Sequence, residues 1–284
     1  MTTTLRPAAP EEPLPGGGRT RHYHVCANGR PIGTLRLSAH ATGPRPTGEI
    51  AGLEITEGRR RGRGTVAVLA AEEVLRGWGC TRVDATVPED AAEALRLAAA
   101  LGYQERMRSM AKRLPTGPPQ LPAGLVERPI DAAAFPDWIA VQEQGYAQSL
   151  VDSGLSPEHA RRKSAADHQA LLPDGVDSPD TALRFLAPAD PPEAPPLGSL
   201  WVQLRGRSLP GGGRLAWVLS VEVAEGSRGH GYGRALMLLA ERCCLAVGVH
   251  DLGLNVFAGN EVARGLYTSL GYRTLDRTLG KALL

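Results

Sequence analysis

The chain has 284 residues, enough for one large or two ordinary domains. Its 32 Lys and Arg residues nearly balance its 30 Asp and Glu residues, so the net charge of +2 does not favour binding to nucleic acid or to a membrane surface. It has no apolar stretch of about 18–20 residues and no apolar signal-peptide centre near its start, and we expect a soluble, cytoplasmic protein.

In the first part of the chain, residues 1–18 are rich in Pro and Gly and are expected to be a disordered tail. Hydrophobic periodicity then predicts an alternation of strands and helices. The predicted strands are 21–28, 31–41, 48–56, 82–87 and 106–114, and the predicted helices are 65–79 and 90–102. A Pro-rich stretch at 115–124 is the expected linker between a domain at 19–114 and a second domain at 125–284.

The second domain opens with two predicted helices, near 135–151 and 156–172. Pro- and Gly-rich loops are expected at 187–198 and 206–213. After them come a strand at 214–225, a helix at 232–247, a strand at 251–257, a helix at 260–271 and a last strand. The first domain has no counterpart of the two leading helices, so its front is expected to be truncated.

The four cysteines do not have the spacing of a metal site and are expected to be buried free thiols: Cys26, Cys80, Cys243 and Cys244. His22, His24 and Cys26 alternate along one strand and would share a face. Since the sequence offers no fourth ligand beside them, no metal is expected.

An internal repeat relates the two domains at a constant offset of 169 residues, the distance from Arg59 to Arg228. The offset also relates Gly62 to Gly231 and persists for some fifty residues. Further matched pairs are Gly64 and Gly233, Glu72 and Glu241, Tyr103 and Tyr272, and Lys112 and Lys281. Two distant copies of one block indicate two similar domains rather than a solenoid.

Both copies contain a glycine-rich turn between a strand and a helix, and in the second copy it reads SRGHGYGRAL from residue 227. A Walker-type phosphate loop requires Lys and Ser or Thr where Arg234 and Ala235 stand. A dinucleotide fingerprint requires a different glycine spacing. A turn without a ligand is the remaining alternative, and the recurrence of the turn between the same elements argues against it.

The pattern R-x-x-G-x-G from Arg228 to Gly233, followed by Asn260 and by LY and LGY at 266–272, resembles the GNAT acyltransferase superfamily. The resemblance implies an α+β fold with two tandem domains, each a mixed, splayed sheet flanked by helices, and acetyl-CoA as cosubstrate. The tandem arrangement resembles that of mycothiol synthases.

Backbone amides at a helix N-terminus bind compact anions, and the resemblance implies that this turn holds the CoA pyrophosphate. It also implies that strand backbone near the turn holds the pantetheine arm. The residues expected to bind acetyl-CoA are Val221, Val223, Arg228, Gly229, His230, Gly231, Tyr232, Gly233, Arg234 and Asn260.

The resemblance aligns Tyr267 with the acid that protonates the departing thiolate; a half-buried aromatic without a catalytic role is the alternative. The base is less clear, since Trp217 and Leu219 occupy the positions where the family often has Glu or His. Glu222 and Asn255 are the polar candidates nearby, and a water relay is the alternative.

The first copy keeps the turn but has Leu53, Thr86, Ala91 and Ala98 at the positions of Glu222, Asn255, Asn260 and Tyr267. Residues 19–114 are therefore expected to form a degenerate domain, with a possible second CoA site at Arg59, Gly62 and Gly64. Catalysis is expected in the second domain.

The acceptor is expected to be a primary amine of a small molecule or peptide, bound near residues 135–172. Glu143, Tyr146 and Asp152 are candidates for contact with it, and a solvated helix face is the alternative. A mycothiol synthase-like substrate and a non-catalytic acyl-CoA sensor or scaffold also stay open, as does the oligomeric state. Neither nucleic acid nor a membrane is an expected partner.

Overall fold

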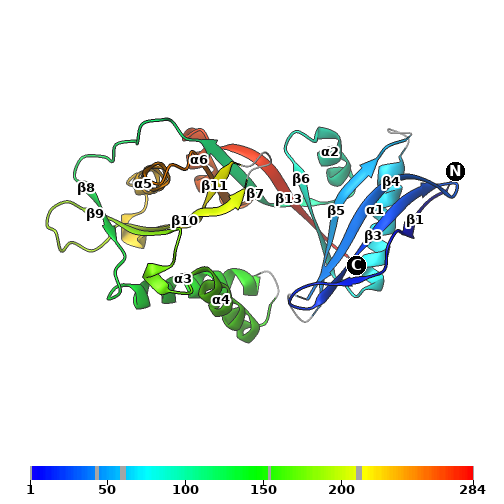
Figure 1. Cartoon of the computed structure of the whole chain (residues 1–284), viewed down its shortest axis with the longest axis horizontal. Helices are drawn as coiled ribbons and strands as arrows, with labels where there is room; N and C mark the ends of the chain where they lie inside the picture. The colour runs from blue at the N-terminus through cyan, green and yellow to red at the C-terminus, as the bar shows by residue number, and fades with distance from the viewer. Residues whose placement is uncertain (1, 42–44, 58–61, 153–154, 209–212, 284) are drawn as a thin grey trace. The chain divides into compact units, whose positions relative to one another are not determined.

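The computed structural model describes residues 2–41, 45–57, 62–152, 155–208 and 213–283. They divide into two compact units, unit 1 with mainly residues 1–108 and 276–284, and unit 2 with mainly residues 109–275. Each unit has a mixed β-sheet and helices (Figure 1), which confirms the predicted α+β class. In the described ranges, no helix has both the length and the apolar character that a membrane crossing requires.

The strands of unit 1 lie in the order β1-β3-β4-β5-β6-β13, in which β5 and β6 are parallel and the other neighbouring pairs are antiparallel. Helix α1 connects the two parallel strands. The elements are β1 (Thr3–Pro7), β2 (Glu12–Pro13), β3 (Gly18–Ala27), β4 (Arg30–His40), β5 (Thr47–Ile55), α1 (Arg63–Gly77), β6 (Arg82–Pro88), α2 (Ala92–Ala100) and β13 (Arg273–Ala282).

The N-terminal segment differs from the expected disordered tail. Strand β1 pairs antiparallel with β3, from Thr3 opposite Ala27 to Pro7 opposite Tyr23. Leu5 of this strand packs against the core of unit 1. The pairing satisfies backbone groups that β3 would otherwise expose at the sheet edge, so a segment with one large apolar side chain is ordered here.

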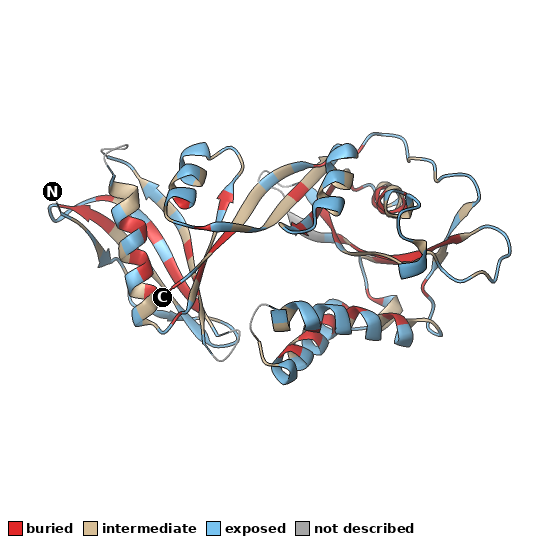
Figure 2. Cartoon of the chain, turned by 180° about the vertical axis from the view of Figure 1, so that it is seen from behind, coloured by how far each residue is buried: buried red, intermediate tan, exposed pale blue. Residues whose placement is uncertain are grey.

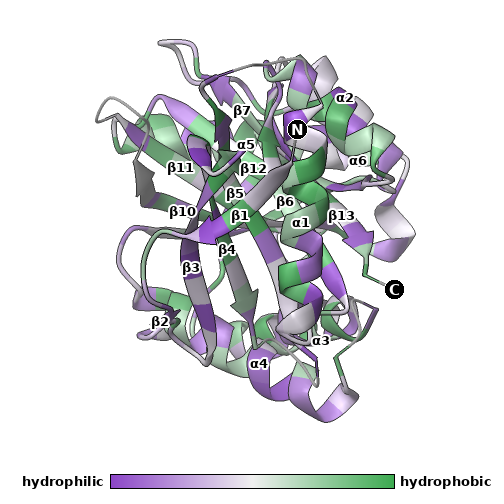
Figure 3. Cartoon of the chain, turned by 90° about the vertical axis from the view of Figure 1, so that its right-hand side faces the viewer, coloured by the Kyte–Doolittle hydropathy of each residue, from purple (hydrophilic) through white to green (hydrophobic). Residues whose placement is uncertain are grey.

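Unit 2 has the strand order β8-β9-β10-β11-β12-β7, with β11 and β12 parallel. Its two leading helices lie close to the predicted ranges, and α4 is mostly hydrophilic (Figure 3). The elements are β7 (Gln104–Arg113), β8 (Leu125–Pro129), α3 (Phe135–Asp152), α4 (Pro157–Leu171), η1 (Gly175–Asp177), β9 (Thr181–Pro188), β10 (Gly198–Ser208), β11 (Arg214–Val223), η2 (Glu225–Ser227), α5 (Tyr232–Ala246), β12 (Asp251–Phe257) and α6 (Glu261–Ser269).

Each unit has its own apolar core, and the buried residues follow one face of the long helix that joins the parallel strands (Figure 2). In unit 2 this helix is α5, where Leu236, Met237 and Leu239 are fully buried. Burial of one such side chain contributes about 1.5–3 kcal/mol. Helix α1 buries Val68 and Leu75 in the same way in unit 1, so both helices are fixed on their sheets by apolar packing.

The two repeats exchange their last strands. Strand β13 belongs to the second repeat in sequence, but it pairs antiparallel with β6 in unit 1, from Asp276 opposite Pro88 to Ala282 opposite Arg82. Strand β7 ends the first repeat, but it lies beside β12 and belongs to unit 2 from Ser109 onward. The exchange includes core residues, because Leu279 packs in the core of unit 1 and Met110 in that of unit 2.

Two buried carboxylates anchor the exchanged strands. Glu241 of α5 and Glu72 of α1 are each 1% exposed. Lys112 of β7 lies 2.6 Å from Glu241 (Nζ to Oε1), and Lys281 of β13 lies 2.9 Å from both Glu72 oxygens. Each lysine thus neutralises a carboxylate encoded by the other repeat, which the matching positions in the sequence did not reveal.

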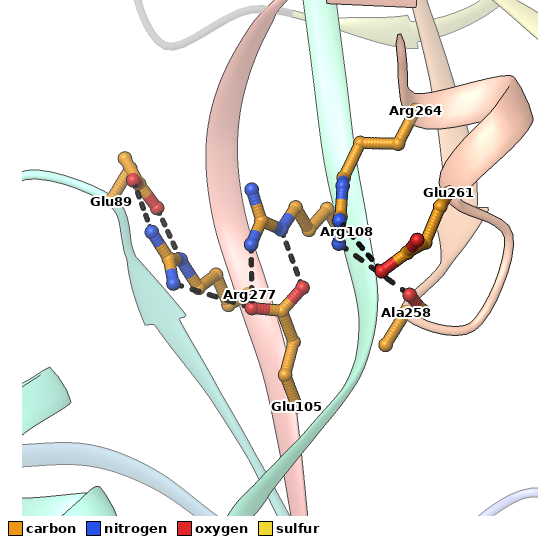
Figure 4. Close-up of polar contacts among 7 residues, drawn as sticks. All are labelled: Glu89, Glu105, Arg108, Ala258, Glu261, Arg264 and Arg277. Carbon is orange, nitrogen blue, oxygen red and sulfur yellow. Dashed lines mark hydrogen bonds and ion pairs between the residues drawn. The ribbon is translucent and has the colours of Figure 1, made fainter.

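A second polar cluster fixes β13 in unit 1 (Figure 4). Arg277 donates two hydrogen bonds to Glu89, at 2.6 Å and 2.5 Å, and lies 3.3 Å from Glu105. Arg108 donates to the same Glu105. The bond from Arg277 lowers the pKa of Glu89 below its ordinary value, as expected for a paired carboxylate.

Candidate functional site

The glycine turn of unit 2 presents unpaired backbone amides. Gly229 and Gly231 both have φ of 82°, and Gly231 caps α5. This left-handed conformation favours glycine. The amides of Arg234 and Ala235 donate to the carbonyl of Gly231. Those of residues 229–233 have no acceptor within the described part of the chain, so they are available to an anion at the positive end of the helix.

The third glycine of the turn has a packing role. A Cβ atom at Gly233 would lie 3.2 Å from Cδ2 of Leu266 and 3.9 Å from Cγ2 of Val223. The absence of a side chain therefore lets the first turn of α5 approach both α6 and the end of β11. The turn is held close to the strand gap in this way.

Strands β11 and β12 diverge beside the turn. They pair only from Ala216 opposite Leu252 to Val218 opposite Leu254. On the other edge of β11, Ser220 lies opposite Trp201 and Val218 opposite Val202, so Leu219 forms a β-bulge. A bulge bends its strand and increases the local twist. Residues 219–223 thus leave the ladder with β12 and open a gap.

Helix α6 of unit 2 and its N-cap contribute two of the predicted site residues, Tyr267 and Asn260. Asn260 caps the helix, because its side chain accepts a hydrogen bond from the amide of Ala263 at 3.0 Å. Tyr267 is half-buried against the core, with its ring 6.1 Å from that of Tyr272. Burial raises the pKa of Tyr267 above its ordinary value of 10.0, so the phenol is protonated at neutral pH.

A cavity of about 790 Å³, here called the β11 cavity, lies between α3, α4 and strands β10, β11 and β12. Glu222 and Asn255 both line it, on the two diverging strands. Gln142 of α3 is buried and donates to Glu222, with Nε2 2.9 Å from Oε2. The remaining polar lining includes Tyr146, Asp167 and His168.

A family comparison bears directly on this arrangement. The model of the acetyltransferase (GNAT) family matches residues 6–103 and again residues 177–272. These two matches cover more than half of the chain. The chain belongs to the GNAT family. It is accordingly an acyltransferase, and the predicted tandem GNAT architecture is confirmed.

Individual proteins that are similar to this chain are also described as N-acetyltransferases or GNAT proteins. The chain is 27% identical over 156 residues to the uncharacterized N-acetyltransferase YycN of Bacillus subtilis, covering 55% of this chain and 96% of the relative. A GCN5-related N-acetyltransferase structure from Sphaerobacter thermophilus has a TM-score of 0.60 at 19% identity, covering 92% and 80% of the two chains. A tandem GNAT protein from the clavulanic acid biosynthesis pathway has a TM-score of 0.52 at 21% identity, covering 95% and 85%.

Within this GNAT protein, the residues predicted from sequence are only partly gathered. Glu222, Asn255 and Val221 line the β11 cavity together, whereas Tyr267 does not line it. Tyr146, a predicted contact of the acceptor, also lines the cavity. Glu143 instead lines a separate cavity of about 620 Å³. Asp152 accepts a hydrogen bond from Gln148 on its own helix.

Five polar or aromatic residues of the β11 cavity were not predicted: Gln142, Asp167, His168, Trp201 and Ser220. One signal in the sequence could have found His168. It is buried with Ala160 and Ser164 at four-residue intervals along α4. That spacing marks one helix face, so a histidine there faces the core side.

Unit 1 repeats the turn without the polar residues. Gly62 has φ of 72° and caps α1, and a Cβ at Gly64 would lie 3.3 Å from Cδ2 of Leu97. Arg59, predicted for a second CoA site, lies outside the described residues. Gly62 and Gly64 line a cavity of about 820 Å³, here called the β5 cavity.

The charges of the β5 cavity differ from those of its counterpart. Glu54, Asp90 and Glu93 line it, where unit 2 has the uncharged residues Val223, Gly259 and Val262. Arg63 and Arg96 are the basic residues of the lining. Three carboxylates and two arginines leave one net negative charge beside the turn of unit 1, whereas the five matching positions in unit 2 carry no charge, so unit 1 is the less favourable of the two for a pyrophosphate at these positions.

Two of the free cysteines, Cys243 and Cys244, stay in the thiol form. Burial raises the pKa of Cys243 to about 11 and that of Cys244 to about 12. A thiol with so high a pKa is a poor nucleophile at neutral pH. Among the described residues no group of three or more His, Cys, Asp or Glu side chains could hold a metal ion.

Proposed function

We propose that the protein is an acetyl-CoA-dependent N-acetyltransferase that acts on a primary amine, with catalysis in unit 2. One observation carries the proposal: the unpaired amides of residues 229–233 and the β11 cavity flank the same gap between two diverging strands. A cosubstrate held by the turn could reach through this gap to an amine in the cavity. GNAT acetyltransferases use acetyl-CoA as cosubstrate.

The residues present fit acetyl-CoA. The open amide cradle suits a pyrophosphate, since a Cβ at Gly229 or Gly231 would meet nothing within 4 Å and no side chain covers the amides from these positions. The amides of residues 229–233, with Arg228 at the entrance and Arg234 in the first turn of α5, would hold the pyrophosphate. The backbone of Val221 and Val223 and the side chain of Asn260 would hold the pantetheine arm.

Bound acetyl-CoA would supply an acetyl thioester whose C–S bond breaks as the amine forms the C–N bond, leaving CoA as a thiol. An alkylamine with a pKa near 10 is mostly protonated at neutral pH and must lose a proton before attack. Glu222 accepts that proton, directly or through water, with Gln142 holding one of its oxygens. Tyr267 donates a proton to the leaving sulfur, and Asn255 lies across the gap from Glu222.

Unit 1 is proposed to be non-catalytic. It has Leu53, Thr86, Ala91 and Ala98 at the four positions that carry polar groups in unit 2. The N-cap residue of its α2 is Ala91, which provides no side-chain cap. No group able to exchange a proton stands at the positions of Glu222 and Tyr267.

Two measurements on the whole chain test the proposal. Calorimetric titration with acetyl-CoA is expected to give one site per chain, and thiol release is expected with members of a panel of primary amines. Absence of binding would contradict the acetyl-CoA site. Two sites of equal affinity would contradict the assignment of the cosubstrate to unit 2 alone.

Substitution of Tyr267 by phenylalanine is expected to lower kcat about 100-fold, the usual contribution of a positioned acid, and to leave KM nearly unchanged. Because burial keeps the phenol protonated, kcat of the native protein should not decline through Tyr267 until the pH exceeds 10.0. Steady-state kinetics across pH measure both effects. Tyr23→Phe, in the core of unit 1, is the control and should retain activity; a Tyr267→Phe variant with equal kcat would exclude Tyr267 as the acid.

A further inference from the structure

The β11 cavity has an unusual charge balance. Its described lining contains two carboxylates, Asp167 and Glu222, and no lysine or arginine. An anionic group on a ligand would therefore find no basic side chain among these lining residues. The net charge of the cavity therefore depends on whether each of these carboxylates is paired with a cation that does not itself line the cavity.

Asp167 is neutralised by its neighbours. Lys163, one turn earlier in α4, lies 2.8 Å and 3.1 Å from its two oxygens. The phenol of Tyr146 donates to Asp167 at 3.0 Å. Burial, with the nearby Asp167 carboxylate, raises the pKa of Tyr146 to about 12, so this phenol remains a neutral donor. Asp167 thus contributes little net charge to the cavity.

Glu222, unlike Asp167, has no lysine or arginine paired with it among the described residues. Its hydrogen-bond partner is the amide of Gln142, at 2.9 Å, which orients the carboxylate without cancelling its charge. No ion pair joins Glu222 to another described residue. The cavity therefore presents one net negative charge on β11, next to the strand gap.

Aromatic rings form the opposite part of the lining. The ring of His168 lies 5.9 Å from that of Tyr146 and 5.5 Å from that of Trp201. His168 is held through Nδ1, 2.8 Å from the carbonyl oxygen of Ser164. The indole Nε1 of Trp201 is buried without a hydrogen-bond partner among the described residues. Aromatic faces beside a carboxylate favour organic cations and disfavour anions.

We propose that the acceptor is a primary amine that binds as its ammonium ion and carries no carboxylate or phosphate group. This inference rests on the proposed function, because it names the substrate class of the same cavity. The ammonium pairs with Glu222, and the apolar part of the molecule lies against Tyr146, His168 and Trp201. The ion pair also brings the amine proton to the oxygen that accepts it. An added anionic group would meet the uncompensated charge of Glu222.

Pairs of amines that differ by one carboxylate test the proposal. In assays with acetyl-CoA, phenethylamine is compared with phenylalanine and cadaverine with lysine. Phenylalaninamide and lysinamide, in which a neutral amide replaces the carboxylate, serve as controls for size. The amine without a carboxylate is expected to have a kcat/KM at least about tenfold higher, since repulsion by a like charge costs more than 1.4 kcal/mol in such a site. Equal values, or a preference for the amino acids, would overturn the proposal.

Direct binding separates this inference from the proposed function. The same amines are titrated calorimetrically into the whole chain without acetyl-CoA. Preferential binding of the amines that lack a carboxylate, without any acetyl transfer, would support the cavity's specificity and contradict the function. Acetyl transfer to all amines alike, with equal affinities, would contradict the specificity and support the function.

A pair of variants assigns the selectivity to Glu222. Glu222→Gln is expected to reduce the binding preference within each amine pair to less than about threefold, because the charge that repels the carboxylate is removed. Glu143→Gln removes a carboxylate from the same part of the fold but outside the β11 cavity, and should leave the preference unchanged. An unchanged preference in Glu222→Gln would overturn the assignment.

Discussion

Replacement of Gly231 by valine is expected to lower the affinity for acetyl-CoA by about 100-fold to 10,000-fold. The substitution places a branched side chain over the amides of residues 229–233 and strains a position whose φ is 82°. Loss of two hydrogen bonds to a charged pyrophosphate corresponds to about 3–6 kcal/mol. Calorimetric titration of the purified variant measures the change directly.

The duplicated turn supplies a matched control. Gly62 caps α1 with a φ of 72°, so Gly62→Val imposes the same kind of backbone strain in unit 1. We expect it to destabilise the fold to a similar degree and to leave acetyl-CoA affinity and acetyl transfer near their native values. Equal losses of affinity in both variants would mean that strain, rather than the amide cradle of unit 2, explains the effect.

The variant Lys112→Met is expected to destabilise unit 2, although residue 112 belongs to the first repeat in sequence. It leaves the carboxylate of Glu241, 1% exposed, without its counter-charge. An unpaired buried charge of this kind costs about 3–5 kcal/mol. Hydrogen exchange should accelerate in α5 for this variant and in α1 for Lys281→Met, which removes the lysine from Glu72 and leaves it the longer ion pair with Arg76, at 3.7 Å.

Two further variants test whether the destabilisation comes from the unpaired buried charge of Glu241. The double variant Lys112→Met/Glu241→Leu removes both charges and should recover most of the lost free energy of unfolding. Arg162→Met, which breaks an exposed ion pair with Glu158 in α4, should change the free energy of unfolding by less than about 1 kcal/mol. If Lys112→Met accelerated hydrogen exchange in α1 instead of α5, the placement of β7 in unit 2 and of β13 in unit 1 would be disproved.

The repeat in the sequence predicted the tandem fold, the shared order of strands and helices in the two copies, and the two glycine turns. It could not predict which unit receives each last strand. Lys112 and Lys281 stand at equivalent positions, as do Glu72 and Glu241, so pairing within a repeat and pairing between repeats give the same local pattern. Only the contacts of the folded chain distinguish the two connections.

The candidate site was predictable where backbone conformation determines it. Glycines at 229 and 231 are needed for positive φ, and this requirement is visible in the sequence. The bulge at Leu219 has no such signal, because a β-bulge of this type accepts ordinary residues. The neighbours of Glu222 were missed for another reason: Gln142 comes from a helix 80 residues away, and only the packing of α3 on the sheet brings them together.

The exchange of strands also determines the order in which the protein can be completed during synthesis. Unit 1 has all its other strands once β6 has left the ribosome, but the edge of β6 cannot pair with β13, and Glu72 cannot pair with Lys281, until residues 273–282 emerge. Unit 2 receives β7 before any of its other strands are made. The half of the chain that is translated first is therefore the last to reach its native structure, and its open edge must be protected from other chains for the whole time that unit 2 is being made.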